Sequence, residues 1–121
     1  MKVLVIDDNK EITEVLKVYC ESRGIQCTTI NDGKKGLETI LEEKFDLILL
    51  DLAMPEFSGI DVVASLRTGG VLSTKNVVIF TATSEPKIIE EMKNSGVKEI
   101  LKKPISIDEL TSFVDRYNPD I

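Results

Sequence analysis

The chain contains no histidine among its 121 residues. Without an imidazole it has no Ser-His or Cys-His nucleophile system, no typical zinc site and no residue to carry a phosphohistidine. Cysteine is almost absent as well, because Cys20 and Cys27 are the only two. They could pair in principle, but we expect reduced thiols with a structural role, since disulfides are rare in cytosolic domains.

Long apolar runs and a basic surplus are also missing. The first apolar run, Val3–Ile6, is far too short to span a membrane and leads into two aspartates. We therefore expect no signal peptide, no membrane insertion and a cytoplasmic location. The chain has 15 basic against 21 acidic residues and a net charge of −6. This balance argues against direct contact with nucleic acid and fits a protein that gathers carboxylates around a cation.

What the sequence has is a regular alternation of two patterns. Five short apolar runs are visible: Val3–Ile6, Cys27–Ile30, Leu47–Leu50, Val77–Phe80 and Ile100–Leu101. Apolar residues at helical spacing follow each run, most clearly Ile12, Val15, Leu16, Tyr19 and Cys20. Five βα units in strict alternation predict a single α/β domain over residues 1–121. Its parallel sheet is doubly wound, with helices on both faces.

The expected helices carry start signals of their own. Asp8 or Asn9 is suited to cap the first helix, because a short polar side chain there accepts a hydrogen bond from a free backbone N–H. Two further pairs have the spacing of capping boxes, Ser58 with Asp61 and Ser106 with Glu109. These signals place helices directly after the polar residues that end the apolar runs.

Polar residues end four of the five expected strands. Asp7 and Asp8 follow the first, Asp51 the third, Thr81 the fourth, and Lys102 and Lys103 the fifth. The carboxyl ends of parallel strands lie along one edge of the sheet, and ligands bind there near the point where the strand order reverses. We therefore expect these side chains to converge.

Each of these residues has an ordinary explanation by itself, as a helix cap or a solvated loop residue. Together they suggest a site that binds a cation and a phosphoryl group. Three neighbouring carboxylates repel one another unless a cation is present, and Mg²⁺ prefers one or two carboxylates, a carbonyl and water. Lys103 and Thr81 on the same edge would suit phosphoryl oxygens. Asp51 is then a plausible acceptor that forms an aspartyl phosphate.

Four motifs carry a family resemblance: "VIDD" at Val5–Asp8, "LLDLAMPEFSG" at Leu49–Gly59, "FTA" at Phe80–Ala82 and "KKP" at Lys102–Pro104. With them the chain resembles the receiver domain of two-component response regulators over essentially its whole length. The resemblance implies a flavodoxin-like fold with strand order 2-1-3-4-5.

The resemblance also implies roles for individual residues. Asp51 would be the phosphoacceptor, and Thr81 and Lys103 would hold phosphoryl oxygens. Asp8 would bind Mg²⁺ directly, together with Asp51 and the backbone carbonyl of Ala53, while Asp7 would act mainly through a bound water. The Lys103–Pro104 peptide bond would be cis.

At a few positions the chain departs from the family pattern. Ile100 stands where the family commonly has an aromatic ring that moves inward, so we expect backbone shifts near Thr81 and the fourth helix to carry the signal. Ala53 and Thr83 flank the approach of a hydrolytic water where many members have an acid or amide. We therefore expect a long-lived aspartyl phosphate. Ile105, where an aromatic is frequent, reads as a packing variant.

The sequence thus predicts a stand-alone receiver, since the chain ends at Ile121 shortly after the fifth expected helix. It would not be an enzyme. It would accept a phosphoryl group from a sensor histidine kinase or histidine phosphotransfer protein. It would then bind an effector protein through the fourth and fifth helices and the strand between them.

Other functions are possible. The chain could be the receiver of a longer transcription factor or hybrid kinase, acting as a dimerisation switch, or a phosphorelay intermediate. A haloacid dehalogenase fits poorly, because it needs a second acid where Ala53 stands. A flavin carrier fits poorly too, since it wants a hydroxyl- and glycine-rich loop where Asp7 and Asp8 follow the first strand.

Overall fold

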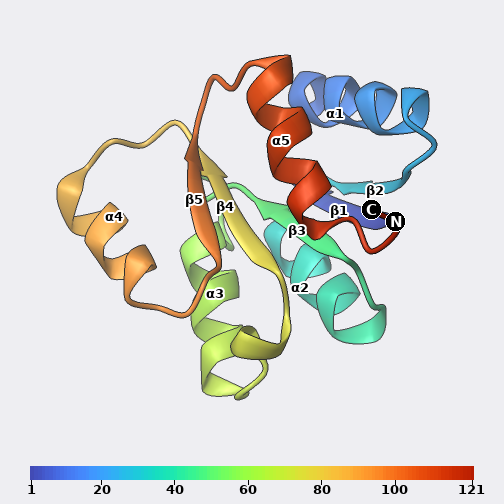
Figure 1. Ribbon diagram of the computed structural model, residues 1–121. Coiled ribbons are helices and arrows are strands. Elements are labelled where there is room, and N and C mark those ends of the chain that lie inside the picture. Colours follow the sequence, from blue (N-terminus) through green and yellow to red (C-terminus); the bar gives the residue numbers. More distant parts are fainter.

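The computed structural model describes all residues, 1–121, and alternates five strands with five α-helices (Figure 1). The strands are β1 (Lys2–Ile6), β2 (Gln26–Ile30), β3 (Leu47–Leu50), β4 (Val77–Thr81) and β5 (Glu99–Lys102). The helices are α1 (Lys10–Ser22), α2 (Gly33–Glu42), α3 (Gly59–Thr68), α4 (Pro86–Lys93) and α5 (Ile107–Tyr117), and a short 3-10 helix, η1 (Leu72–Thr74), precedes β4.

The strands form one parallel sheet in the order β2-β1-β3-β4-β5, which confirms the predicted topology. Ile6 at the end of β1 pairs with Ile30 of β2 on one side and Leu50 of β3 on the other. The chain steps from β1 outward to β2 and then returns to β3, so the strand order reverses between β1 and β3. This reversal is where a parallel sheet of this kind binds its ligands.

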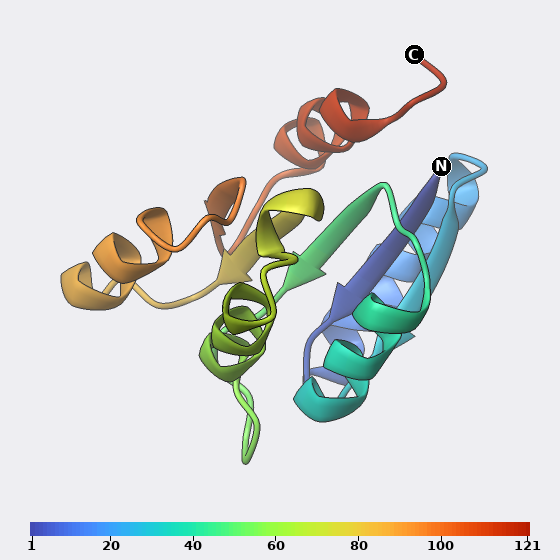
Figure 2. The same cartoon turned by 90° about the horizontal axis from the view of Figure 1, so that it is seen from below.

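Helices cover both faces of the sheet (Figure 2). Successive residues of a strand point to opposite faces. In β1, Leu4 and Ile6 accordingly belong to the core cluster that includes residues of α2, α3 and α4, whereas Val3 and Val5 belong to the cluster that includes residues of α1 and α5. All of Leu47–Leu50 is buried, which explains why β3 reads as a continuous apolar run rather than an alternating one.

The helix starts agree with the sequence except in one detail. Asn9 caps α1, and Ser58 and Asp61 form the reciprocal capping box at α3. At α5 the predicted box is only half formed. Ser106 Oγ accepts a hydrogen bond from the Glu109 backbone N–H, but the Glu109 carboxylate accepts from the Ser106 hydroxyl instead of the Ser106 backbone N–H.

Three smaller features complete the fold. Except for β3, which matches, the expected strands were one or two residues too short; β2, for example, begins at Gln26 and β5 extends over Glu99–Lys102. Cys20 and Cys27 are free thiols beside the α1–α5 core, as expected. The helices are all too short or too polar to cross a lipid bilayer.

Candidate functional site

Three carboxylates meet at the point where the strand order reverses. Asp7 and Asp8 follow β1, and Asp51 follows the neighbouring β3. The Asp51 N–H donates to the Ile6 carbonyl at the end of β1 over 2.9 Å. One oxygen from each carboxylate lies within 4.8 Å of the others. Asp7 and Asp51 are buried and Asp8 is exposed. The acids that the sequence predicted to converge are therefore close enough to share one cation.

The loop after β3 is pressed against Asp51. The Gly59 N–H donates to the Leu52 carbonyl over 3.0 Å, which folds the start of α3 back onto the end of β3. A Cβ atom at Gly59 would lie 2.0 Å from the Asp51 carbonyl oxygen, a distance that no side chain can adopt. Glycine at this position lets α3 begin directly against the backbone of Asp51, and this close packing restricts the movement of the aspartate.

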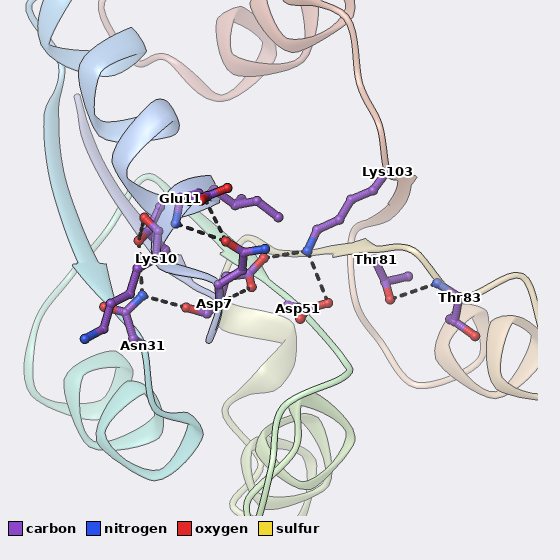
Figure 3. A network of polar contacts seen from close by, with 11 residues as sticks. Asp7, Lys10, Glu11, Asn31, Asp51, Thr81, Thr83 and Lys103 are labelled. Carbon is purple, nitrogen blue, oxygen red and sulfur yellow. Dashed lines mark hydrogen bonds and ion pairs between the residues drawn. The ribbon is translucent and has the colours of Figure 1, made fainter.

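The Lys103 side chain extends toward Asp7 and Asp51 (Figure 3). It follows β5, and its N–H donates to the Thr81 carbonyl over 2.8 Å. Its ammonium lies 2.5 Å from Asp7 Oδ2 and 3.6 Å from Asp51 Oδ1. The Lys103–Pro104 bond is cis, as the resemblance implied. Lys103 thus serves as the counter-ion of the two buried carboxylates.

Thr81 ends β4 and starts a short chain of hydrogen bonds toward α4. Its buried hydroxyl accepts a hydrogen bond from the Thr83 N–H, 3.3 Å away. The Thr83 hydroxyl in turn accepts from the N–H of Glu85, the N-cap residue of α4, over 3.4 Å. A movement of the Thr81 hydroxyl would therefore disturb the hydrogen bonds that lead to the start of α4.

Sequence reasoning missed Asn31, which directly follows β2. Its side-chain amide donates to the Asp7 carbonyl over 2.8 Å (Figure 3). The signal was available, because β2 ends at the same edge of the sheet as the other strands. Asn31 could therefore have been predicted to lie at the same edge of the sheet as Asp51 and Thr81.

The surroundings raise the pKa of the Asp51 carboxyl to about 6. Burial is the main cause, because it disfavours the charged form, and the nearby negative charge of Asp7 adds to it. Lys103 and a hydrogen bond from the Ala53 backbone N–H act in the opposite direction without cancelling the rise. A cation that enters the site would therefore stabilise the charged form of the Asp51 carboxyl.

The comparison with known proteins decides which family has this arrangement. The profile of the family described as "Response regulator receiver domain" matches residues 3–115, nearly the whole chain. The chain belongs to the response regulator receiver domain family. This places the receiver domain in two-component signal transduction, and its flavodoxin-like α/β fold is that of the family.

Individual relatives agree. Sporulation initiation phosphotransferase F of Bacillus subtilis is 30% identical over 118 residues, which cover 98% of this receiver domain and 94% of that protein. The solved receiver domain of the Francisella response regulator 1452 is 36% identical with a TM-score of 0.85, over 96% and 94% of the two chains. Response regulator TrrA of Thermotoga maritima, solved with Mg²⁺ and BeF, is 26% identical with a TM-score of 0.81, over 97% and 98%.

Other relatives are longer proteins. The receiver domain spans about half the length of several curated transcriptional regulatory proteins, among them 55% of CrdR of Helicobacter pylori. It spans 13% of the autoinducer 2 sensor kinase/phosphatase LuxQ of Vibrio vulnificus. Receiver domains therefore occur both as nearly whole proteins and as parts of larger ones.

The residues of this receiver domain fit a Mg²⁺ ion. Receiver domains bind Mg²⁺ at an acidic pocket, and Asp7, Asp8 and Asp51 form such a pocket here. All of its donors are hard oxygen atoms, which Mg²⁺ prefers, and the exposure of Asp8 leaves room for the waters that this ion retains. No backbone hydrogen bond ends on the Ala53 carbonyl, so this oxygen is free to complete the set. The individual ligand roles stay predictions.

Proposed function

We propose that this receiver domain is a phosphorylation-dependent switch in which Asp51 accepts a phosphoryl group from a phosphohistidine. The supporting observation is the juxtaposition of Asp51 with Asp7, Asp8 and the Lys103 ammonium at the edge where the strand order reverses. The donor would be a sensor histidine kinase or a histidine phosphotransfer protein, the partners with which receiver domains interact.

In the proposed reaction, a carboxylate oxygen of Asp51 forms a bond to phosphorus as the phosphorus–nitrogen bond of the donor breaks. The electron pair of that bond stays on the donor's imidazole nitrogen. Mg²⁺, when bound, neutralises charge on Asp51 and on the phosphoryl oxygens. Lys103 would turn from Asp7 to a phosphoryl oxygen, and the Thr81 hydroxyl would donate to another. The domain is a phosphoacceptor that assists its own modification rather than an enzyme with a separate substrate.

An apolar groove of about 360 Å³ opens beside Lys103, between α1 and the β5–α5 connection. Ile12 and Val15 of α1 line one side, and Pro104 and Ile107 line the other. A donor seated there would bring its phosphohistidine within reach of Asp51. We place the donor in this groove and the effector on the face formed by α4, β5 and α5.

The effector face would respond through the hydrogen bonds from Thr81 to Thr83 and on to Glu85. If the Thr81 hydroxyl moves toward a phosphoryl group to donate to it, its distance from the Thr83 N–H increases, which changes the start of α4. Ile100 is half-buried and has no ring to move inward. Amide NMR shifts with and without a phosphoryl mimic test this. Changes confined to residues around Asp51 would contradict the proposal.

A second candidate is a phosphorelay intermediate that passes its phosphoryl group to another histidine. The similarity to sporulation initiation phosphotransferase F over 94% of that protein's length favours it. A transfer assay to a histidine phosphotransfer protein separates the two. The stand-alone state, the lack of nucleic-acid contact and the cytoplasmic location stay predictions.

The main test uses acetyl phosphate as the donor. With Mg²⁺, the wild-type chain should gain about 80 Da, the mass of one phosphoryl group. Asp51→Asn should gain nothing. Asp46→Asn is the matched control, because Asp46 is also a strand-flanking aspartate but lies at the other edge of the sheet, where its carboxylate accepts from the Lys2 N–H. An unchanged gain in Asp51→Asn would refute the proposed acceptor.

A further inference from the structure

The Asn31 side chain connects three segments that border the acidic site (Figure 3). Its amide nitrogen donates to the Asp7 carbonyl over 2.8 Å and to the Thr13 hydroxyl over 3.1 Å. The buried Thr13 hydroxyl donates in turn to the Lys10 carbonyl over 3.1 Å. Asn31 thereby links the end of β2 to the end of β1 and to the first turns of α1.

Asp7 is held on its backbone and on its side chain. Its N–H donates to the Ile30 carbonyl over 3.1 Å, and its carbonyl accepts from Asn31. Its carboxylate accepts from the Asn9 N–H over 2.9 Å and from Lys103. The position of Asp7 therefore has several independent supports, of which Asn31 is one.

Asp8 has no such support. It is exposed, and none of the side-chain hydrogen bonds or ion pairs at the site involves its carboxylate. Its orientation depends on the backbone that carries it. The Asp7 carbonyl and the nitrogen and Cα of Asp8 belong to one planar peptide unit. Whatever holds the Asp7 oxygen therefore holds the plane from which the Asp8 side chain projects.

We propose that Asn31 is a positioning residue of the cation site. It fixes the Asp7–Asp8 peptide plane and so directs the Asp8 carboxylate toward Asp51, without touching the cation or the phosphoryl group. This inference rests on the proposed function, since it concerns a ligand of the cation that the proposed reaction requires. Groups that orient metal ligands typically change metal affinity by about 10- to 100-fold when removed.

The chain provides a closely matched control. The Asn76 side-chain nitrogen donates to the Asp46 carbonyl over 2.9 Å, so the same residue type makes the same bond to the same backbone atom. Asn76 lies directly before β4, at the opposite edge of the sheet from the acids. A loss of general stability should affect both asparagines, whereas a loss of metal-ligand orientation should affect Asn31 alone.

The test compares the full chain with Asn31→Ala and Asn76→Ala in a Mg²⁺ titration followed by amide NMR. Asn31→Ala should raise the Mg²⁺ Kd about tenfold, and Asn76→Ala should leave it unchanged. Without Mg²⁺, the Asp7 amide hydrogen, which is bonded to the Ile30 carbonyl, should exchange faster in Asn31→Ala only. At saturating Mg²⁺, the phosphorylation rate of Asn31→Ala should return to the wild-type value, because Asn31 does not contact the reacting atoms.

An unchanged Kd in Asn31→Ala would overturn the inference, as would an equal rise in both variants. If Asn31→Ala does not fold, Thr13→Val removes one acceptor of the Asn31 amide and should raise the Kd about two- to threefold. An unchanged value in that variant would equally overturn it. A wild-type chain whose Asp8 and Asp51 amides do not respond to Mg²⁺ would instead refute the proposed function.

Discussion

The aspartates at the carboxyl ends of the strands differ from Asp46, at the amino end of β3, in how their charge is neutralised. At the carboxyl edge, Asp7 and Asp51 are buried next to each other, with Asp8 nearby, and share the single ammonium of Lys103. At the amino edge, Asp46 precedes β3, and its carboxylate accepts from the Lys2 N–H over 2.7 Å. Its own N–H donates to the Lys2 carbonyl over 2.8 Å, and its carbonyl accepts from Asn76.

The difference separates a structural aspartate from the one that we propose as the phosphoacceptor. The backbone of the neighbouring strand satisfies Asp46, which joins β1 to β3 and needs no further partner. The carboxylates at the opposite edge have more negative charge than the protein neutralises, which is why the pKa of Asp51 is raised. Crowded acids of this kind destabilise the fold until a cation binds. The following predictions test this contrast, beginning with the largest effect.

Replacing Lys103 should have the largest effect. In Lys103→Ala the phosphoryl group loses a charged donor, and we expect the rate of phosphorylation by acetyl phosphate to fall by about 100- to 1,000-fold. Lys2→Ala removes the corresponding lysine of the amino edge, an exposed side chain 3.7 Å from Glu43, and should leave the rate unchanged. Intact mass measured over time gives both rates. A similar small loss in both variants would contradict the assignment of Lys103.

The pH dependence of stability is the next test. Because the folded-state pKa of Asp51, about 6, exceeds its ordinary value of 3.8, the native state holds this proton more tightly than the unfolded state. Stability from this group is complete below pH 3.8 and is lost as the pH rises through 6. The loss should be about 3 kcal/mol in the Mg²⁺-free protein.

Urea denaturation at pH 4 and pH 7 measures this change. Asp51→Asn should lack the contribution and be more stable than wild type at pH 7, whereas Asp46→Asn should retain the dependence and be less stable. A more stable Asp46→Asn would show that the two edges do not differ in the way described here.

Mg²⁺ should reverse this destabilisation. At a free concentration about 100-fold above its Kd, it should increase the free energy of unfolding by about 2.7 kcal/mol. Thermal unfolding in MgCl₂, against NaCl of equal ionic strength, measures the increase. It should be largely lost in Asp8→Asn and Asp51→Asn and kept in Asp46→Asn. Equal stabilisation of all the variants would indicate weak, unspecific binding.

The smallest predicted effect concerns the lifetime of the aspartyl phosphate. Ala53 is exposed two residues after Asp51 and has no polar atom to orient a water. Ala53→Asn supplies an amide there and should accelerate hydrolysis about tenfold. Ala64→Asn, at an exposed alanine of α3, is the control. An unaltered rate of dephosphorylation in Ala53→Asn would refute the argument from water placement.

Much of the site was predictable because it lies at strand ends. The buried run Leu47–Leu50 was located to the residue, and the geometry of parallel strands then placed Asp51 at the same edge of the sheet as Asp7. These features depend on local patterns and on the geometry common to all parallel sheets, so no three-dimensional information was needed. The sequence limited the cap of α1 to Asp8 or Asn9, and the structure assigns it to Asn9.

Other features depended on distances that no sequence pattern encodes. The ion pair between Lys103 and Asp7 was not predicted, because it depends on how the ends of β1 and β5 sit in space. Glu109 has the spacing of a capping box, yet its carboxylate accepts from the nearby Ser106 hydroxyl. Asn31 acts through a backbone carbonyl, and every residue type has that atom, so no motif marks the contact.

The burial of Leu47–Leu50 has a mechanical consequence. The buried strand before Asp51 and the tight contact at Gly59 leave no space behind the aspartate for the bulky, doubly charged group that the proposed reaction would add. The displacement must then occur on the open side, among Lys103 and the residues between Thr81 and α4. Tight packing behind Asp51 would thus direct the structural effect of the proposed phosphorylation toward surface segments that a partner can contact.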